Sequence, residues 1–370
     1  MMGKSTEGKT SFKSMLKELT EAPGPPGFER AVREVMEQYA TPYADEIHKD
    51  RLGSFIARKG TTGPRIMITG HMDEVGFMVT RITDDGFLRF HPLGGWWGQV
   101  LPAQRVEVIT SKGRHLGVVG SVAPHLLEPA KRKKGVEVTD LFVDLGVENK
   151  EEIDQLGIRP GDFIIPYSPF TTMSNENRWL AKAMDNRLGC AVALGVLQEL
   201  SEDDVLHQNQ VFSVGTVMEE VGCRGAITSA QVVDPDISIV VDVGIATDSL
   251  GTTNPHGDTK MGGGPLLVLY DAGHIAHCGM IDFVKQVAEE EGIPYQFEVI
   301  TGGATDNHFI HTHKTGVPSI SLGVPTRYIH SHSSILDRRD CEALVRWIVA
   351  IVERLDEAKV KEIRGVFEAK

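Results

Sequence analysis

The sequence predicts an α/β fold with a central mixed β-sheet, helices on both faces of that sheet, and an inserted small β-barrel domain. Apolar strand-like runs alternate with amphipathic helical patterns near the N-terminus and again from Trp179 onward, as expected of a sheet covered on both faces. Between these parts, from Phe77 to about Phe170, short apolar segments are interrupted by glycine and proline every few residues. That texture is typical of a small barrel or sandwich.

The elements follow from hydrophobic periodicity and from breaks at glycine and proline. Helices are predicted over 12–19 and 32–39, and strands near Ile47 and over 54–57 and 66–71. After the β-rich stretch, the predicted elements are a helix over 189–200, strands over 210–217 and 237–242, a helix over 283–291, strands over 295–300 and 319–322, and a helix over 339–355. The simplest organisation is a discontinuous α/β domain, residues 1–72 and 171–370, with a β-rich domain inserted at 73–170.

Composition argues against several classes of partner. The 370 residues carry a formal net charge of -13, which disfavours generic binding to nucleic acid or to anionic membranes. The 4 cysteines are widely spaced and form no CxxC pair, so neither a zinc ribbon nor a disulfide framework is indicated. No apolar run reaches the ~18 residues of a transmembrane helix, and no signal-peptide pattern is present. We therefore expect a cytoplasmic protein.

The predicted strand over 66–71 ends in a histidine, and an aspartate follows two residues later. Side chains alternate along a strand, so His71 and Asp73 should point the same way. A carboxylate beside a metal-ligating histidine fixes its tautomer and ring orientation. Taken alone, the motif is more typical of a hydrogen-bonded structural histidine than of a metal ligand.

Four further motifs place an acid or an imidazole at a strand end or a helix start. They are Ala183-Met184-Asp185-Asn186-Arg187, Met218-Glu219-Glu220-Val221-Gly222, Val240-Val241-Asp242-Val243-Gly244 and Tyr328-Ile329-His330-Ser331-His332. Sites in open α/β sheets form at the carboxyl edge of the strands, so these groups can converge on His71. Singly, each could be a helix cap, a solvated acid, a turn or a surface histidine. Together, unpaired carboxylates would repel, and a metal is the common remedy.

Such a set suits two cations that lie close together. The two histidines and three acids would be His71, Asp185, Glu220, Asp242 and His330. Bound metal would lower the pKa of a water molecule from ~15.7 toward ~7, and a free carboxylate nearby could act as general base. The adjacent pair Glu219 and Glu220 offers both a ligand and a base, because adjacent residues at a strand end point in different directions.

These motifs closely resemble the signatures of the tetrahedral (TET-type) metalloaminopeptidase family, which includes glutamyl aminopeptidases and relatives labelled endoglucanases. Four stretches carry the resemblance, in order along nearly the whole chain: His71-Met72-Asp73-Glu74-Val75-Gly76, Ala183-Met184-Asp185-Asn186-Arg187, Glu219-Glu220-Val221-Gly222-Cys223-Arg224-Gly225-Ala226 and Arg327-Tyr328-Ile329-His330-Ser331. The resemblance implies a zinc-exopeptidase-like fold and an aminopeptidase that removes the N-terminal residue of short peptides with two divalent ions per subunit, zinc or cobalt.

The resemblance also implies a role for each residue. His71 and His330 would be terminal ligands on different metals, and Asp185 would bridge the two metals. Glu220 and Asp242 would complete the ligand sets. Glu219 would be the general base acting on a metal-activated water, and Asp73 would orient His71. A cis peptide bond is implied between Asp185 and Asn186. The inserted domain resembles the family's dimerisation domain, which implies self-association into dimers that build a dodecamer.

The chain departs from the family pattern in one segment. Gly303-Ala304-Thr305-Asp306-Asn307-His308 stands where relatives usually read Gly-Gly-Thr-Asp-Ala-Gly. This segment lies near the substrate site in relatives, so the departure bears on specificity rather than on the metals. His308, His311 and His313 could bind a third metal or contact the substrate, but we expect them to lie simply at the surface.

Two other activities remain open at this stage. One is a metal-dependent deacylase of N-acyl amino acids, and the other is a glycosidase, which would need two carboxylates and no metal. A preference for glutamyl substrates would need a basic residue in the substrate pocket, and the sequence does not decide whether Lys182, Arg187 or Arg224 reaches it.

Overall fold

A nine-stranded mixed sheet forms the centre of the α/β domain in the computed structural model, which describes residues 11–202, 205–252, 255 and 257–367. Its strands, in spatial order, are β1 (Glu46–Lys49), β2 (Phe55–Lys59), β12 (Gln210–Thr216), β3 (Arg65–His71), β13 (Ile237–Ile245), β17 (Ser319–Thr326), β14 (Leu266–Asp271) and β15 (His274–Ile275), with β16 (Gln296–Val299) paired to β14. The four strands from β12 to β17 are parallel. Their carboxyl ends therefore meet at one edge.

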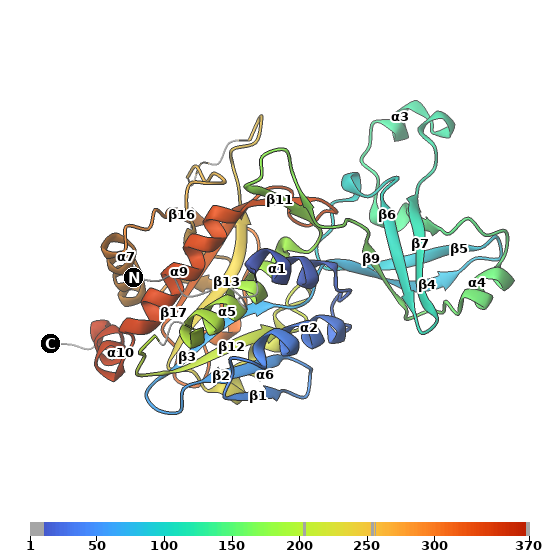
Figure 1. The fold of residues 1–370 in the computed structure, drawn as a ribbon. Helices are drawn as coiled ribbons and strands as arrows, with labels where there is room; N and C mark the ends of the chain where they lie inside the picture. The colour runs from blue at the N-terminus through green and yellow to red at the C-terminus, as the bar shows by residue number, and fades with distance from the viewer. Residues whose placement is uncertain (1–10, 203–204, 253–254, 256, 368–370) are drawn as a thin grey trace.

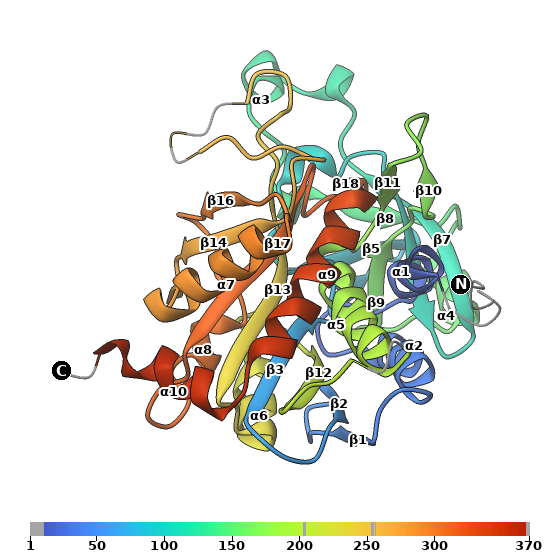
Figure 2. The same ribbon diagram turned by 60° about the vertical axis from the view of Figure 1, so that its left-hand side comes forward.

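Helices cover both faces of this sheet (Figures 1 and 2). One face carries α1 (Phe12–Glu21), α2 (Arg30–Ala40), α5 (Met184–Glu202), α7 (Cys278–Glu290), α9 (Arg338–Arg354) and α10 (Glu357–Arg364), and the other carries α6 (Arg224–Val233) and α8 (Asn307–Ile310). The alternation of β3 explains the two layers: Ile66 and Ile68 pack into the larger helical core, whereas Met67 packs into the core beneath α6.

The inserted segment closes into a barrel that projects from the α/β domain (Figure 1). Its strands are β4 (Gly76–Ile82), β5 (Phe87–Leu93), β8 (Phe142–Asp144), β7 (Gly113–Gly120), β6 (Arg105–Thr110) and β9 (Phe163–Pro166), and its helices are α3 (Pro129–Arg132) and α4 (Lys150–Leu156). Single 3₁₀ turns lie at Gly98–Val100, Pro124–Leu126, Val138–Asp140 and Gly365–Phe367. The barrel has a core of its own around Phe77, Val106 and Ile164, as an independent layer requires.

A small three-stranded sheet joins the two parts. It consists of β10 (Thr171–Thr172), β11 (Arg178–Ala181) and β18 (Ser334–Asp337). β11 leads into α5 and β18 leads into α9, so this sheet fixes the start of the helix that carries Asp185. Across the described ranges, no helix has the length and apolar character needed to cross a bilayer.

The predicted fold class is confirmed. The main differences lie at helix boundaries: α5 begins at Met184 rather than at 189, with non-helical dihedral angles at Asp185 and Asn186, and α7 begins at Cys278 rather than at 283. Helices α6 and α10 and strand β14 were not expected. The division into domains at 1–72 and 171–370 against 73–170 stays a prediction, and residues 1–10 of the first segment lie outside the described residues.

Candidate metal centre

The five predicted ligands meet at the carboxyl edge of the parallel strands. His71 ends β3, Asp242 lies in β13, and Asp185 lies in the first turn of α5. Glu220 follows β12, and His330 follows β17. All five line one cavity of about 330 Å³, so residues up to 259 positions apart in sequence share one space because the sheet brings its strand ends together.

Asp185 lies between the two histidines. Its Oδ1 is 3.1 Å from Nε2 of His71, and its Oδ2 is 3.3 Å from Nε2 of His330. The Nε2 atom of His330 also lies 3.4 Å from Oε2 of Glu220. One ligand atom from each of His71, Asp185 and Glu220 lies within 4.8 Å of the others, a spacing that a shared cation can span.

Backbone carbonyl groups set the tautomer of both histidines. Nδ1 of His71 is 3.1 Å from the carbonyl oxygen of Asp73, and Nδ1 of His330 is 2.7 Å from that of Gly95. A carbonyl oxygen only accepts, so each Nδ1 donates its hydrogen and each Nε2 is directed at the acids. Gly95 belongs to the inserted segment, which therefore helps to orient a residue of the α/β domain. Sequence reasoning missed this contact, because a backbone carbonyl leaves no residue-type signal.

The carboxylates of this cluster raise the pKa of both histidines. Burial alone would lower the pKa of His71, but the carboxylates of Glu219, Asp185 and Asp73 outweigh it and hold that pKa well above its ordinary value. In the same way, hydrogen bonds to Asp185 and Glu220 overcome burial and raise the pKa of His330 to about 11.

Three acids of the cluster hold a proton more tightly than usual because they are buried. Burial is the largest cause that raises the pKa of Glu219, Glu220 and Asp242, and neighbouring carboxylates raise it further. The Oε1 atom of Glu220 is buried and has no hydrogen-bond partner within the described part of the chain. Imidazoles, carboxylates and an unpaired buried oxygen form a donor set that fits divalent cations of the zinc or cobalt type.

Asp73 has a wider structural role than the sequence suggested. Its carboxylate lies 3.5 Å from Nδ1 of His71, and it also accepts hydrogen bonds from the backbone N–H groups of Glu219 and Glu220, at 2.9 and 3.0 Å. Asp73 is fully buried. One carboxylate therefore fixes the turn that carries both glutamates against the histidine.

Glu219 faces the same cavity but lies apart from the Asp185 contacts. Its Oε2 is 3.8 Å from Nε2 of His71, and its Oε1 is 3.3 Å from the Sγ of Cys223, whose thiol donates to it. The side chain is 10% exposed. A carboxylate held in this way, next to the cluster and open to the cavity, can accept a proton from a bound water molecule.

The implied cis peptide bond between Asp185 and Asn186 is present. The Asn186 side chain donates to the carbonyl oxygen of Val241 at 2.8 Å and accepts from the N–H of Gly189 at 2.9 Å. The start of α5 is thereby attached to β13 beside Asp242. This network explains why Asp185 does not act as an ordinary helix cap.

The departing segment 303–308 contributes to the cavity through its first half. Gly303, Ala304 and Thr305 line the cavity, whereas Asn307 is fully buried and bonds the hydroxyl groups of Ser238 and Ser321. The added asparagine is therefore a core hydrogen-bonding residue.

The three nearby histidines do not line this cavity. His313 lies 3.1 Å from Asp234, and the ring of His311 packs against that of His274 with centroids 5.1 Å apart. Both are half-buried, as is His308. These histidines are therefore partly exposed positions outside the cavity, and each also packs against a neighbouring side chain.

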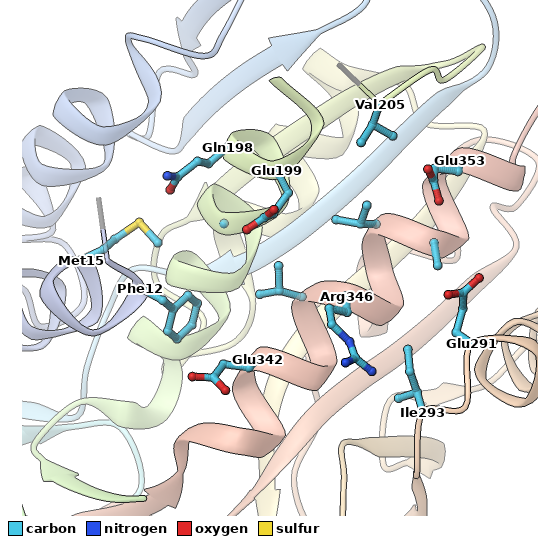
Figure 3. A pocket seen from close by; sticks show the side chains of 14 residues that line it. Phe12, Met15, Gln198, Glu199, Val205, Glu291, Ile293, Glu342, Arg346 and Glu353 are labelled. Carbon is cyan, nitrogen blue, oxygen red and sulfur yellow. The ribbon is translucent and has the colours of Figure 1, made fainter. Parts of the chain in front are cut away.

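A larger cavity of about 670 Å³ lies on the helical face of the α/β domain (Figure 3). Phe12 and Met15 from α1 face side chains of α5 and α9 across it, and its charged groups are Glu199, Glu291, Glu342, Arg346 and Glu353. Its lining includes no histidine and none of the predicted ligands. Volume alone thus does not identify the reactive site; the convergence of titratable groups does.

Comparison with known families agrees with this geometry. A family model described as M42 glutamyl aminopeptidase matches residues 53–347. The chain belongs to the M42 aminopeptidase family. The predicted resemblance is confirmed, and so is the prediction of a metal-dependent aminopeptidase, a hydrolase that acts on peptide bonds.

Relatives in the M42 family cover nearly the whole chain. A glutamyl aminopeptidase of Lactococcus lactis is 36% identical over 95% of this chain and 98% of its own length. A lysyl aminopeptidase of Pyrococcus furiosus is 32% identical over 92% of this chain and 96% of its own length. The two relatives are named for opposite substrate charges, so membership of the family leaves the preferred first residue open.

Solved structures of M42 relatives have the same fold. A TET aminopeptidase from a marine sediment thaumarchaeon is 44% identical, with a TM-score of 0.93 over 95% of this chain and 99% of that one. The TET1 peptidase of Pyrococcus horikoshii is 32% identical, with a TM-score of 0.84 over 93% and 100%. That peptidase can assemble into a tetrahedron or a large octahedral shell.

Proposed function

We propose that this M42 enzyme is a di-metal aminopeptidase that removes the N-terminal residue of short peptides. The single observation that carries the proposal is Asp185, whose two carboxylate oxygens each face the Nε2 atom of a different histidine, His71 and His330. In the proposal, Asp185 would be the ligand shared by two ions, each histidine would be a terminal ligand on a different ion, and Glu220 and Asp242 would complete the two ligand sets. Zinc or cobalt fits these donors.

Bound divalent ions supply acidity to water and polarise the substrate carbonyl group. The protein's own part in the reaction is assigned to Glu219 and Asp73. Glu219 takes a proton from the attacking water through the oxygen that faces the cavity, and it returns that proton to the nitrogen of the departing peptide as the C–N bond breaks. Asp73 holds Glu219 and His71 in fixed relative positions through the contacts described above.

A chelator tests this proposal against a glycosidase. We expect activity on aminoacyl anilides to be lost in chelator and restored by zinc or cobalt, whereas a glycosidase with two carboxylates would not need metal. A requirement for a free α-amine separates the aminopeptidase from a deacylase of N-acyl amino acids, because the deacylase would cleave only the acylated substrate. Failure to cleave any anilide with any metal added would overturn the proposed function.

The variant Glu219→Gln tests the role of the base. We expect kcat to fall by ~100- to 10,000-fold, the usual contribution of a general base, while the metal content measured by atomic emission stays that of the unmodified enzyme. Asp282→Asn, a substitution on the outer surface of α7, is the matched control and should leave kcat unchanged. Near-normal turnover by Glu219→Gln would show that another group moves the proton.

We further propose that the chain self-associates through the inserted domain into dimers and then into a dodecamer, in the cytoplasm. The support is its likeness to TET1 of Pyrococcus horikoshii, which forms closed shells. Light scattering on the eluted protein measures the assembly directly. A monomer of 40.5 kDa at micromolar concentration would contradict this part of the proposal and leave the chemistry untouched.

A further inference from the structure

One part of the reactive cavity is apolar. Val243 and Ile245, which lie one and three residues after Asp242, line the cavity together with Ile300 and Ile329. Ile245 is 47% exposed, so a large aliphatic surface is available to a substrate beside the proposed ligands. Apolar lining with a few well-placed polar groups is the usual composition of a small-molecule pocket.

The charged groups of the cavity are already committed to other roles. They are His71, Asp185, Glu219, Glu220, Asp242 and His330, the groups that we propose as ligands and base. In the lining formed by residues that the structure describes, no lysine or arginine is present. A negatively charged substrate side chain would therefore face acids on one side and isoleucines on the other.

The basic residues in or beside the family motifs are held elsewhere. Nζ of Lys182 lies 2.6 and 2.7 Å from the two carboxylate oxygens of Glu74. Arg187 is fully buried and donates to the backbone carbonyl of Met72 at 2.6 Å. Arg224 starts α6 and is exposed outside the cavity lining. The structure thus answers the question that the sequence left open, because none of the three reaches the pocket.

One buried acid, Glu298, contacts the backbone of the strand that supplies part of the apolar lining. Oε1 of Glu298 accepts a hydrogen bond from the backbone N–H of Ile245 at 2.8 Å. The side chain is only 2% exposed, and its other oxygen packs against the backbone of Gly244. Glu298 is therefore directed at strand β13 and is not placed to receive a substrate ammonium group.

We infer that the enzyme prefers an aliphatic first residue, such as leucine, isoleucine or methionine, and that Ile245 is a determinant of this preference. The inference rests on the proposed aminopeptidase function. An aliphatic side chain gains free energy by leaving water against this lining, whereas a glutamyl or lysyl side chain would lose hydration without gaining a counter-ion. The preference would set this chain apart from its glutamyl- and lysyl-named relatives.

A panel of leucyl, glutamyl and lysyl p-nitroanilides, run with the metal-loaded full-length enzyme, tests the preference. We expect kcat/KM for the leucyl substrate to exceed the other two by roughly 10- to 100-fold. A higher value for the glutamyl or the lysyl substrate would overturn the inference while leaving the proposed function in place. Cleavage of none of the three would instead count against the proposed function itself.

Two variants at one position locate the determinant. Ile245→Lys brings a cation to the apolar lining, and we expect it to lower the leucyl-to-glutamyl ratio of kcat/KM by about tenfold or more. Ile245→Ala only shortens the side chain, so it should lower kcat/KM more for the leucyl substrate than for the glutamyl substrate, even if the lysine variant folds poorly.

Ile275→Lys is the matched control. Ile275 is 73% exposed on β15 in the same domain and lies outside the reactive cavity. The control therefore makes the same isoleucine-to-lysine change as the test variant, but away from the cavity. We expect its leucyl-to-glutamyl ratio to equal that of the unmodified enzyme. If both Ile245 variants also kept that ratio, the side chain of Ile245 would not determine specificity.

Discussion

Two buried charged clusters are built from residues that are neighbours in sequence. They differ in the balance between carboxylates and cationic side chains. Asp73 belongs to the candidate metal centre, whereas its neighbour Glu74 binds Lys182 and Arg187. Asp185 belongs to the metal centre, and Arg187, two residues later, belongs to the second cluster. In the second cluster, one carboxylate has two cationic partners, all within 3.2 Å. In the metal centre, the acids outnumber the histidines.

The difference shows what each cluster needs for stability. A buried carboxylate is tolerated when charges and hydrogen bonds of the protein compensate for its lost hydration. Glu74 is compensated in this way. For Glu219, Glu220 and Asp242 the compensation is smaller, because burial raises the pKa of each carboxyl group despite the nearby histidines. The candidate metal centre therefore has a donor set that favours an added cation, whereas Glu74 finds both of its cationic partners within the described chain.

Asp185→Asn should have the largest effect, because it removes the carboxylate that faces both histidines. We expect kcat/KM to fall on the order of 10,000-fold, since activation of water and stabilisation of the oxyanion are lost together. Metal at 1,000 times its Kd should stabilise the unmodified protein by about 4 kcal/mol, and this stabilisation should largely disappear in the variant.

Thermal unfolding with and without zinc measures that loss. The Asp282→Asn control on α7 should keep the full metal-dependent rise in melting temperature. An Asp185→Asn protein that still gained the same stability from zinc would show that Asp185 is not a ligand.

Lys182→Met tests the cluster that the protein completes by itself. Removing one partner of a buried ion pair costs about 3 kcal/mol or more, here moderated because Arg187 still contacts Glu74 at 3.2 Å. We expect a lower urea midpoint but an unchanged metal content in the folded protein.

The double variant Lys182→Met with Glu74→Gln separates charge from packing. With the carboxylate also removed, no uncompensated charge remains, so part of the lost stability should return. If the double variant were as unstable as the sum of the two single variants, the cost would come from packing rather than from the ion pair.

Glu298→Gln addresses a buried acid that forms no ion pair with the described residues and lies outside the lining of the candidate metal centre. Burial raises the pKa of Glu298 from 4.5 to about 7. A carboxyl group whose pKa is higher in the folded state is fully favourable below pH 4.5, and its contribution is lost as the pH rises through 7. The free energy of unfolding should therefore fall by up to about 3 kcal/mol over this range in the unmodified protein relative to the variant.

Urea unfolding in chelator at pH 5 and pH 8 measures this smallest effect. Glu289→Gln, at an exposed position of α7, is the control and should follow the unmodified protein. Parallel pH dependence of the Glu298→Gln variant and the unmodified protein would show that the carboxyl group is ionised in the folded state throughout.

Several features could be read from the chain before its structure was known. Strand β3 was evident from the apolar run that leads into His71, and the barrel was evident from the spacing of glycine between 77 and 170. The five proposed ligands could be named because several such motifs, in order along the chain, are specific even though each one alone is not. Helix α6 was missed because Gly225 and the small residues that follow weaken its hydrophobic pattern.

By itself, the sequence determined the fold class, the family and the residue types that surround the cavity, because periodicity and motif order are local properties of the chain. Only the tertiary structure decided which partners those residues have. In the folded chain, Glu74 pairs with Lys182, whereas Asp185 lies between two histidines. The carbonyl group of Gly95 orients His330, and isoleucines rather than arginines line the cavity. Such pairings depend on distances across the sheet edge between residues far apart in sequence, and no local pattern encodes those distances.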